Sequence, residues 1–432
     1  MKRIRYGTAA WRRYLDALPR AGRPRPGVER AVSRILRDVE RTGDAALVRW
    51  TARLDGVRLQ RAQIRMDGAE ARRLADAAER PVRRALAAMA TRIEAFHRRQ
   101  LAPGFRLPVG PGSSVEEIVT PLPSAGLYVP GGAGAYPSSV LMNAIPAIVA
   151  GVRDLWIATP PRTLETNPAV AAAIVGVGLE DRVIRVGGAQ AIAALAFGTD
   201  TVPAVAKIAG PGNAYVAEAK RQVRGRVDVD REAGPSEVVI LADDTADARW
   251  VAADLLAQAE HGSGEETVVL VTTSAALADD VVRRVALGAH SVANHAAARR
   301  ALGRHGAIVL VADMDDGIAA VNALAPEHAE VMAHAADAVS RRIVAGAVFV
   351  GAWSPVAVGD YGIGPNHVLP TGGAARYASP LSVRDFQRRH SRVRLSRAGL
   401  AHVTADVVRV AQVEGFRGHA QSVLSRFEAP DA

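Results

Sequence analysis

The chain has 432 residues, of which 49% are hydrophobic and 23% charged, the balance of a folded globular protein with more than one domain. It contains no cysteine, which excludes disulfides, thiolate metal sites, iron–sulfur clusters and a cysteine nucleophile. Any metal must therefore be held by nitrogen and oxygen. The N-terminus lacks the apolar region of a signal peptide, and the longest apolar stretch, 140–152, is too short to span a bilayer. These features predict a cytoplasmic protein without membrane association.

The net charge of +10 is concentrated in the first quarter of the chain. Residues 1–110 hold 26 Lys and Arg against 11 Asp and Glu, whereas the remainder is net acidic. One interpretation is a nucleic-acid surface. However, no aromatic residues are interleaved with the charges, and no known nucleic-acid motif accompanies them. We therefore interpret the excess as solvated, arginine-rich helix faces and expect no nucleic-acid partner.

In chain order, the first predicted elements are helices. One buried helical stripe consists of Val32, Ile35, Leu36 and Val39. A second helix is predicted to begin at Pro81 and to carry an apolar seam as far as Phe96. From about residue 120, short apolar runs alternate with helical segments. Strands are predicted at 154–159, 181–188, 207–210, 237–243 and 307–313, with helices at 189–197, 214–223 and 245–261. This alternation predicts an α/β fold with parallel sheets, repeated over two units.

Two polar pairs stand out against the apolar pattern. Gln258 and His261 are three residues apart at the end of a predicted helix, so both project from one face. They could ligate a metal or only cap the helix. Glu327 and His328 follow Pro326, and both side chain types can act as general bases. A plain surface turn is the alternative for this pair.

The remaining candidates lie in glycine-rich loops near the C-terminus. Asp360 and His367 are seven residues apart within 359–370, and His419 follows the segment Glu414–Gly418 between two predicted helices. Gln258, His261, Asp360 and His419 would together form a nitrogen and oxygen site that suits zinc or manganese.

Several long motifs, in this order, resemble the histidinol dehydrogenase family. They are the stretches at 128–147, 186–199, 207–223, 233–243, 254–262, 326–328 and 359–373. The resemblance implies oxidation of L-histidinol through L-histidinal to L-histidine with reduction of two NAD. It implies a Zn²⁺ ion, with Mn²⁺ as the alternative, held by Gln258, His261, Asp360 and His419.

The resemblance also implies roles for individual residues. His328 would take the alcohol proton during hydride transfer, and Glu327 would activate water on the aldehyde. The implied NAD contacts are Tyr128, Gln190 and Asn213. The implied substrate contacts are Ser236, Gln258, His261, His328, Asp360, His367, Glu414 and His419.

The family resemblance further implies a homodimer in which the C-terminal segment completes the partner's site. We accordingly predict two incomplete Rossmann-like units. The expected parts are an N-terminal arm (1–25), a first Rossmann-like domain with N-terminal helices (26–125 and 238–380), a second on the NAD side (126–237), and a C-terminal helical dimerisation segment (381–432).

Two stretches depart from the family pattern. Residues 374–397 are unusually rich in arginine, and the tail GHAQSV (418–423) lacks the Lys-Asn expected after its histidine. The nearest alternative is therefore a paralogous zinc- and NAD-dependent dehydrogenase that acts on another small alcohol. A nucleic-acid-binding protein and a catalytically silent metal-binding scaffold are the more distant alternatives.

Overall fold

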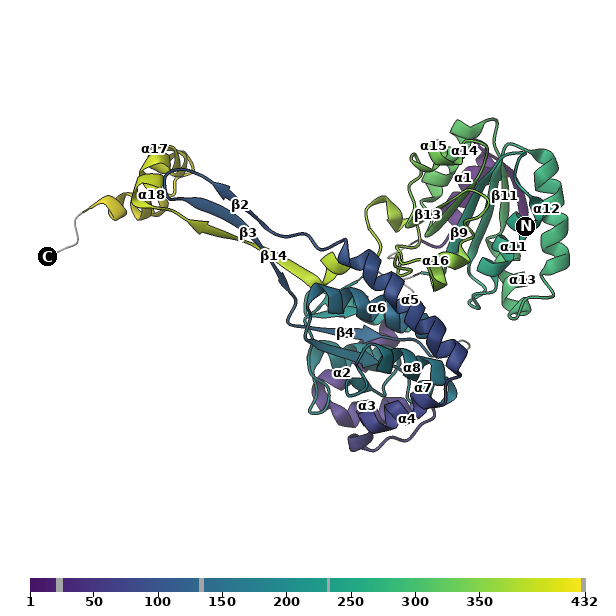
Figure 1. Ribbon diagram of the computed structural model, residues 1–432, viewed down its shortest axis with the longest axis horizontal. Coiled ribbons are helices and arrows are strands. Elements are labelled where there is room, and N and C mark those ends of the chain that lie inside the picture. Colours follow the sequence, from purple (N-terminus) through teal and green to yellow (C-terminus); the bar gives the residue numbers. More distant parts are fainter. Residues whose placement is uncertain (21–25, 132–135, 231–233, 429–432) are drawn as a thin grey trace. The chain divides into compact units, whose positions relative to one another are not determined.

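The computed structural model describes residues 1–20, 26–131, 136–230 and 234–428 (Figure 1). The chain divides into two compact units. Unit 1 comprises Met1–Gln100 and Leu122–Phe386, and unit 2 comprises Leu101–Pro121 and Gln387–Ala432. Unit 1 contains two parallel sheets, one of five strands and one of six. Within the described ranges, no helix is both long and apolar enough to cross a membrane.

The five-stranded sheet has the order β6-β5-β4-β7-β8, and all its strands are parallel. Its strands are β4 (Ser124–Tyr128), β5 (Asp154–Ala158), β6 (Val183–Ile184), β7 (Lys207–Ala209) and β8 (Asp228–Val229). The chain begins in the middle, moves outward to β6, and then returns to the other side of β4. In doubly wound sheets, ligands bind at the carboxyl ends of the strands where the order reverses, which here are β4 and β7.

Helices cover this sheet. The connecting helices are α6 (Pro137–Ala150), α7 (Thr163–Thr166), α8 (Pro168–Gly176), α9 (Gly188–Phe197) and α10 (Ala214–Val223). The N-terminal helices α2 (Pro26–Thr42), α3 (Asp44–Leu54), α4 (Gly68–Asp76) and α5 (Arg80–Arg98) pack here too. The predicted stripe of α2 is confirmed, because Val32, Ile35, Leu36 and Val39 are buried in one core with Trp156 of β5.

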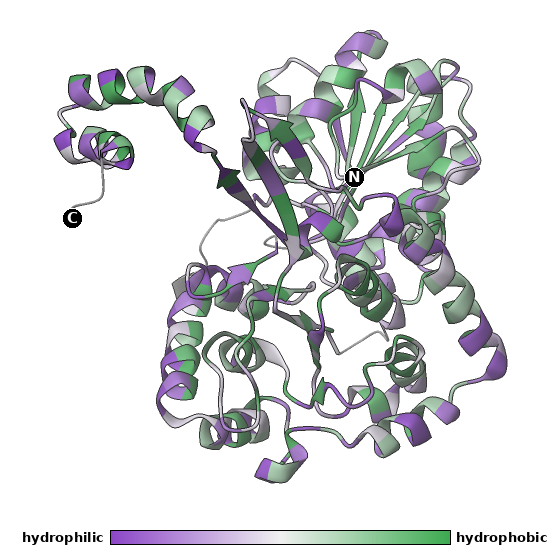
Figure 2. Ribbon diagram, turned by 60° about the vertical axis from the view of Figure 1, so that its left-hand side comes forward, coloured by the Kyte–Doolittle hydropathy of each residue, from purple (hydrophilic) through white to green (hydrophobic). Residues whose placement is uncertain are grey.

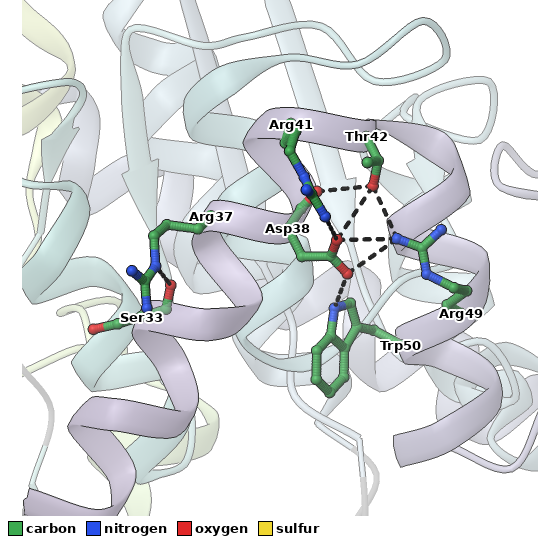
Figure 3. Close-up of polar contacts among 7 residues, drawn as sticks. All are labelled: Ser33, Arg37, Asp38, Arg41, Thr42, Arg49 and Trp50. Atoms are coloured by element: carbon green, nitrogen blue, oxygen red, sulfur yellow. Dashed lines mark hydrogen bonds and ion pairs between the residues drawn. The ribbon is translucent and has the colours of Figure 1, made fainter.

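Helices α2 and α3 are also joined by polar contacts around Asp38 (Figure 3). Its carboxylate accepts hydrogen bonds from the Trp50 indole N–H at 2.9 Å and from Arg49 at 3.0 Å. Burial opposes the charged form, but these hydrogen bonds and the charge of Arg49 lower the pKa of Asp38. Part of the arginine excess of this region is therefore paired within the helical layer.

The six-stranded sheet has the order β1-β11-β10-β9-β12-β13 and is also entirely parallel. Its strands are β1 (Lys2–Arg5), β9 (Glu237–Ala242), β10 (Thr267–Thr272), β11 (Ala307–Leu310), β12 (His328–Met332) and β13 (Ala347–Val350). Figure 2 shows strongly hydrophobic strands in this sheet, as expected when helices cover both faces. The helices are α1 (Ala9–Ala17), α11 (Ala248–Ala259), α12 (Ala275–Gly288), α13 (His295–Arg304), α14 (Met314–Leu324), α15 (Ala336–Ser340) and α16 (Ala357–Tyr361).

Unit 2 is small and carries little core. Its antiparallel sheet consists of β2 (Phe105–Pro108), β3 (Ser114–Pro121) and β14 (Gln387–Arg394), followed by helices α17 (Arg397–Val413) and α18 (Arg417–Leu424). Many of its large apolar side chains are exposed, namely Phe105, Leu107, Val393, Val407, Val410, Val413 and Phe416. Exposed apolar surface of this kind is typical of a protein–protein contact.

The structure corrects three of the predicted boundaries. Residues 1–20 form no separate arm, because β1 pairs with β11 and α1 buries Trp11 and Tyr14 in the core of the six-stranded sheet. Residues 21–25 of that predicted arm lie outside the described residues. The helices of 26–98 share their cores mainly with the five-stranded sheet, because their apolar stripes face that sheet's helices, and Val368 is the buried residue of 238–380 that joins them. The segment 381–432 is not wholly helical, since β14 pairs with β3 along eight residues.

Candidate active site

The predicted catalytic pair lies at the amino-terminal edge of the six-stranded sheet. His328 is the first residue of β12 and Glu327 precedes it, and they are 3% and 6% exposed. The neighbouring strand β9 begins at Glu237, directly after the half-buried Ser236. The parallel register pairs His328 with Val238, so that Glu327 lies beside Glu237.

The hydrogen bonds of His328 define its tautomer. Its Nδ1 lies 3.0 Å from the backbone oxygen of Glu237 and 3.5 Å from Oε2 of Glu327. A carbonyl oxygen can only accept a hydrogen bond, so Nδ1 carries the hydrogen. Once the ring has lost its second proton, Nε2 is therefore the nitrogen that can accept one, which is the arrangement that a general base requires.

The charges of the pair are coupled. Burial disfavours protonation of His328, but the charge of Glu327 and a hydrogen bond to it raise the pKa of His328 to about 9. For Glu327, burial favours the neutral form, but the charge of His328 and its hydrogen bond lower the pKa of this carboxyl below its ordinary value. The two side chains thus form a buried ion pair at neutral pH, in which the imidazole is protonated.

Other predicted residues come to the same edge. Helix α11 runs back from the carboxyl end of β9 to the start of β10, which brings Gln258 and the exposed His261 to the amino-terminal edge. The charge of His261 contributes to lowering the pKa of Glu327, and that of Asp360 to raising the pKa of His328. Asp360 lies in α16, and its backbone oxygen is 3.2 Å from Nδ1 of His367.

The donor set suits a metal ion by its chemistry. Gln258 is 2% exposed, and its amide nitrogen has no hydrogen-bond partner within the described ranges. Such an unpartnered N–H group fits an acceptor atom of a bound ligand, while the amide oxygen of the same side chain is the atom that could ligate a cation. His261 and Asp360 add an imidazole and a carboxylate from the same unit. No three His, Cys, Asp or Glu side chains within the described ranges form a ready cluster.

The last predicted metal ligand and one substrate contact belong to unit 2. His419 is on α18, and Glu414 follows the end of α17. Both side chains are exposed, and the rings of His419 and Phe416 lie 5.1 Å apart. These residues are thus accessible for contacts with another molecule.

The predicted NAD contacts lie at the carboxyl-terminal edge of the five-stranded sheet. Tyr128 ends β4, and its hydroxyl accepts a hydrogen bond from the N–H of Gly188 at 3.0 Å. Gln190 on α9 is 1% exposed and donates to Asp55 at 3.3 Å. Asn213 caps α10 by accepting from the N–H groups of Tyr215 and Val216 at 3.0 and 3.2 Å. The reversal of strand order places these residues around the ends of β4 and β7.

A buried ion pair that the sequence analysis missed holds the loop before α10. Lys220 pairs with Asp230, and both are at most 4% exposed. Lys220 donates to the backbone oxygen of Gly210 at 3.0 Å, and Asp230 accepts from the N–H of Gly210 at 2.7 Å. The feature of the sequence that could have indicated this ion pair is Lys220 itself, a lysine on the otherwise apolar face of α10.

Two further residues near the catalytic pair were also missed. Glu237 exchanges hydrogen bonds with Glu327. In the sequence, the feature that could have indicated its role is a carboxylate directly before the apolar run VVIL. Asn366 is 4% exposed and donates to the backbone oxygen of Met142 at 2.6 Å, which fastens the loop of Asp360 and His367 to α6. Residues 132–135 and 233 of the matching motifs lie outside the described residues.

Comparisons with known proteins agree on one family. The family model for histidinol dehydrogenase matches residues 19–427. The histidinol dehydrogenase of Aromatoleum aromaticum is 45% identical over 403 residues, covering 92% of this chain and 91% of that protein. That of Bradyrhizobium diazoefficiens is 46% identical over 397 residues, covering 92% of each.

A solved structure shows the same fold. The crystal structure of histidinol dehydrogenase from Elizabethkingia anophelis is similar with a TM-score of 0.92 and 30% sequence identity, covering 99% of this chain and 98% of that one. Sequence and structure therefore agree over nearly the full length, and the chain belongs to the histidinol dehydrogenase family.

Proposed function

We propose that this protein is a zinc-dependent, NAD-linked histidinol dehydrogenase that oxidises L-histidinol through L-histidinal to L-histidine and reduces two NAD. The observation that carries the proposal is the buried Glu327–His328 pair, which lies at an edge shared with Gln258, His261 and Asp360. Membership of the family supports the choice of substrate.

In the first oxidation, the alcohol carbon gives a hydride to the nicotinamide of NAD, and the hydroxyl proton passes to Nε2 of His328. The fixed Nδ1–H bond to the Glu237 carbonyl keeps the imidazole oriented for this transfer. The products are L-histidinal, NADH and a protonated imidazole.

In the second oxidation, the carboxylate of Glu327 takes a proton from water, and the oxygen adds to the aldehyde carbon. The resulting hydrate anion gives its hydride to a second NAD and becomes the carboxylic acid of L-histidine, which releases its proton to solvent as the carboxylate forms. The lowered pKa of Glu327 keeps this side chain ionised and able to accept a proton. Because a released aldehyde would be lost to solvent, we expect both steps to share one site.

The ion would be held by Gln258, His261, Asp360 and the His419 of a second copy, with Mn²⁺ as the alternative to Zn²⁺. When bound, it would supply a cation that holds the imidazole and amino group of the substrate. Ser236, His367 and Glu414 would complete the substrate contacts. Tyr128, Gln190 and Asn213 would contact NAD, because they surround the switch point of the five-stranded sheet.

A homodimer in which unit 2 serves the partner's site follows from the same reasoning. Unit 2 exposes Val410, Val413 and Phe416 next to the exposed Glu414 and His419. A small unit with this much apolar surface gains stability when a second copy covers it. The proposed metal site would then be complete only in the dimer.

The stoichiometry of NADH tests the whole proposal. Purified protein should form two NADH per L-histidinol, should lose this activity with a metal chelator, and should regain it with zinc. No NADH from L-histidinol by protein that still binds zinc would contradict the proposed substrate and favour the paralogous alcohol dehydrogenase.

The division of roles between the two catalytic residues gives a separate prediction. His328→Gln should slow the first oxidation, because the base that accepts the alcohol proton is lost, by roughly 10²- to 10⁴-fold. Glu327→Gln should chiefly slow the second, which is measured by supplying L-histidinal directly and following one NADH. An equal loss of both half-reactions in Glu327→Gln would contradict the assignment.

A further inference from the structure

The amino-terminal edge of the six-stranded sheet contains a second buried glutamate that the proposed steps do not use. Glu237 is the first residue of β9 and is 6% exposed. Its backbone N–H donates to Oε2 of Glu327 at 2.9 Å. In return, the backbone N–H of Glu327 donates to Oε2 of Glu237 at 3.1 Å. The two residues thus form a closed ring in which each carboxyl group binds the other's peptide.

At this end of the sheet, the ring takes the place of the backbone hydrogen bonds that pair neighbouring strands. The first N–H of a parallel strand lies beyond the ladder, and a buried N–H without a partner is costly. On the other side of the same residue, the backbone oxygen of Glu327 accepts from the N–H of Ala347 at 2.9 Å. The backbone of Glu327 is therefore fixed on both sides, and its N–H depends on the Glu237 side chain.

The preceding turn explains why such an anchor is needed. Ala325 has φ of 47°, and within the described ranges it is the one non-glycine residue with positive φ. Pro326 then restricts the chain directly before Glu327. A side chain in this left-handed conformation is strained and persists when surrounding contacts hold it. The hydrogen bond from Glu327 N–H to Glu237 is one of the contacts that hold the chain directly after this turn.

We propose that Glu237 is a positioning residue for the catalytic pair, whose carboxyl group fixes the peptide of Glu327 and thereby aims the Glu327 carboxylate at the reacting aldehyde. This inference rests on the roles proposed above for Glu327 and His328. It assigns to Glu237 no contact with the substrate.

The protonation states of the two neighbouring carboxyl groups agree with a positioning role for Glu237 and a proton-accepting role for Glu327. Burial and the charge of Glu327 raise the pKa of Glu237 to about 8, although the N–H groups of Glu327 and Gly372 favour its ionised form. Two ionised carboxylates this close would repel each other. Glu237 therefore keeps its proton at neutral pH, and Glu327 remains the anion that can accept one.

The neutral state of Glu237 makes an informative pair of variants available. Glu237→Gln keeps the shape and a carbonyl oxygen that can accept from Glu327 N–H. Glu237→Met keeps the length of the side chain but offers no such acceptor. A residue that only fills space would tolerate methionine as well as glutamine. A positioning residue would tolerate glutamine alone.

The experiment compares the two half-reactions in these variants. L-Histidinal with one NAD reports the second oxidation, and the single-turnover burst of NADH from L-histidinol reports the first. We expect Glu237→Gln to oxidise L-histidinal within about threefold of the unaltered enzyme. We expect Glu237→Met to lose at least about tenfold in kcat for L-histidinal, with a smaller loss in the first oxidation and an unchanged KM for L-histidinol.

Asp44→Leu provides the matched control for stability. Asp44 is also 6% exposed and accepts from a backbone N–H, that of Thr201 at 3.4 Å, but it lies in the helical layer of the five-stranded sheet. Its loss should lower the melting temperature and leave the ratio of the two half-reactions unchanged. If Glu237→Met does not fold, Glu237→Asp replaces it. The shorter side chain withdraws the acceptor, and the same selective loss is expected.

The outcomes separate this inference from the proposed function. Wild-type oxidation of L-histidinal by Glu237→Met, or by Glu237→Asp where methionine does not fold, would overturn the inference. So would an equal loss in both half-reactions. By contrast, full oxidation of L-histidinal by Glu327→Gln would overturn the proposed role of Glu327 itself, whatever the Glu237 variants do.

Discussion

At the scale of single residues, His328 sets the pH at which the first oxidation can proceed. Its pKa is about 9, because the charge of the neighbouring Glu327 and its hydrogen bond outweigh the effect of burial. A protonated imidazole cannot accept the alcohol proton, so the rate of the first NADH burst should rise with pH towards about 9.

Glu327→Gln gives the matched test of this dependence, because it removes the charge and keeps the shape. The rising limb should then move to lower pH. A limb that stays in place in this variant would show that Glu327 does not control the protonation of His328.

A buried glutamate next to a half-buried aspartate should affect stability rather than turnover. Glu330 of β12 is fully buried, and burial together with the charge of Asp254 raises the pKa of Glu330 to about 9. A raised carboxyl pKa in the folded state means that stability is lost as pH rises from about 5 to about 9. Glu330→Gln should therefore raise the melting temperature relative to the unaltered protein at pH 9, with a smaller difference at pH 5. An equal difference at both pH values in thermal melts would contradict this assignment.

At the scale of elements, the turn from β7 into α10 depends on Gly210. Its φ is 121°, and a Cβ at this position would lie 2.1 Å from the backbone oxygen of Tyr128. Gly210→Ala should displace the end of β4 and the cap of α10 at the proposed NAD site. We expect a rise of roughly tenfold or more in the KM for NAD. Gly176→Ala in α8 is the control, because a Cβ there meets nothing within 4 Å.

The elements also show where sequence patterns suffice. The predicted helix at 214–223 matches α10, since its apolar period and the capping Asn213 are local features. The strand β14 was missed because its sequence, QRRHSRVR, has almost no apolar residues and seven of its eight residues are exposed. Its strand form depends on pairing with β3, which is remote in the sequence. The edge strand β1 was missed for the same reason.

At the scale of the whole molecule, the two sheets of unit 1 share the same order of five strands, to which the six-stranded sheet adds the edge strand β1. Counting from β4 or from β9, the chain moves outward through two strands and returns on the other side through two more. The sequence shows no internal repeat that would reveal this shared strand order.

At the carboxyl end of β9, Asp243 accepts a hydrogen bond from the N–H of His334 at 2.8 Å and is held ionised by its hydrogen bonds. A carboxylate there would repel a pyrophosphate, so the similar topology does not imply a second NAD site.

The proposed dimer can be tested by complementation. His419→Asn and His328→Gln should each be inactive alone. If His419 acts in the partner's site, a mixed dimer contains one intact site, and co-expression in equal amounts should restore about a quarter of the wild-type activity by random pairing. Absence of restored activity in isolated mixed dimers would show that each chain uses its own His419.

The sequence by itself determined the α/β class, the family, and most of the candidate site residues, because long motifs and apolar periods are local properties of the chain. Only the tertiary structure decided which sheet the N-terminal helices cover and that the charges of His261 and Asp360 act on the pair of Glu327 and His328 at one edge. It also revealed the ring between Glu237 and Glu327, ninety residues apart. Such contacts arise from strand order and from the return of α11 along the sheet, which no local pattern encodes.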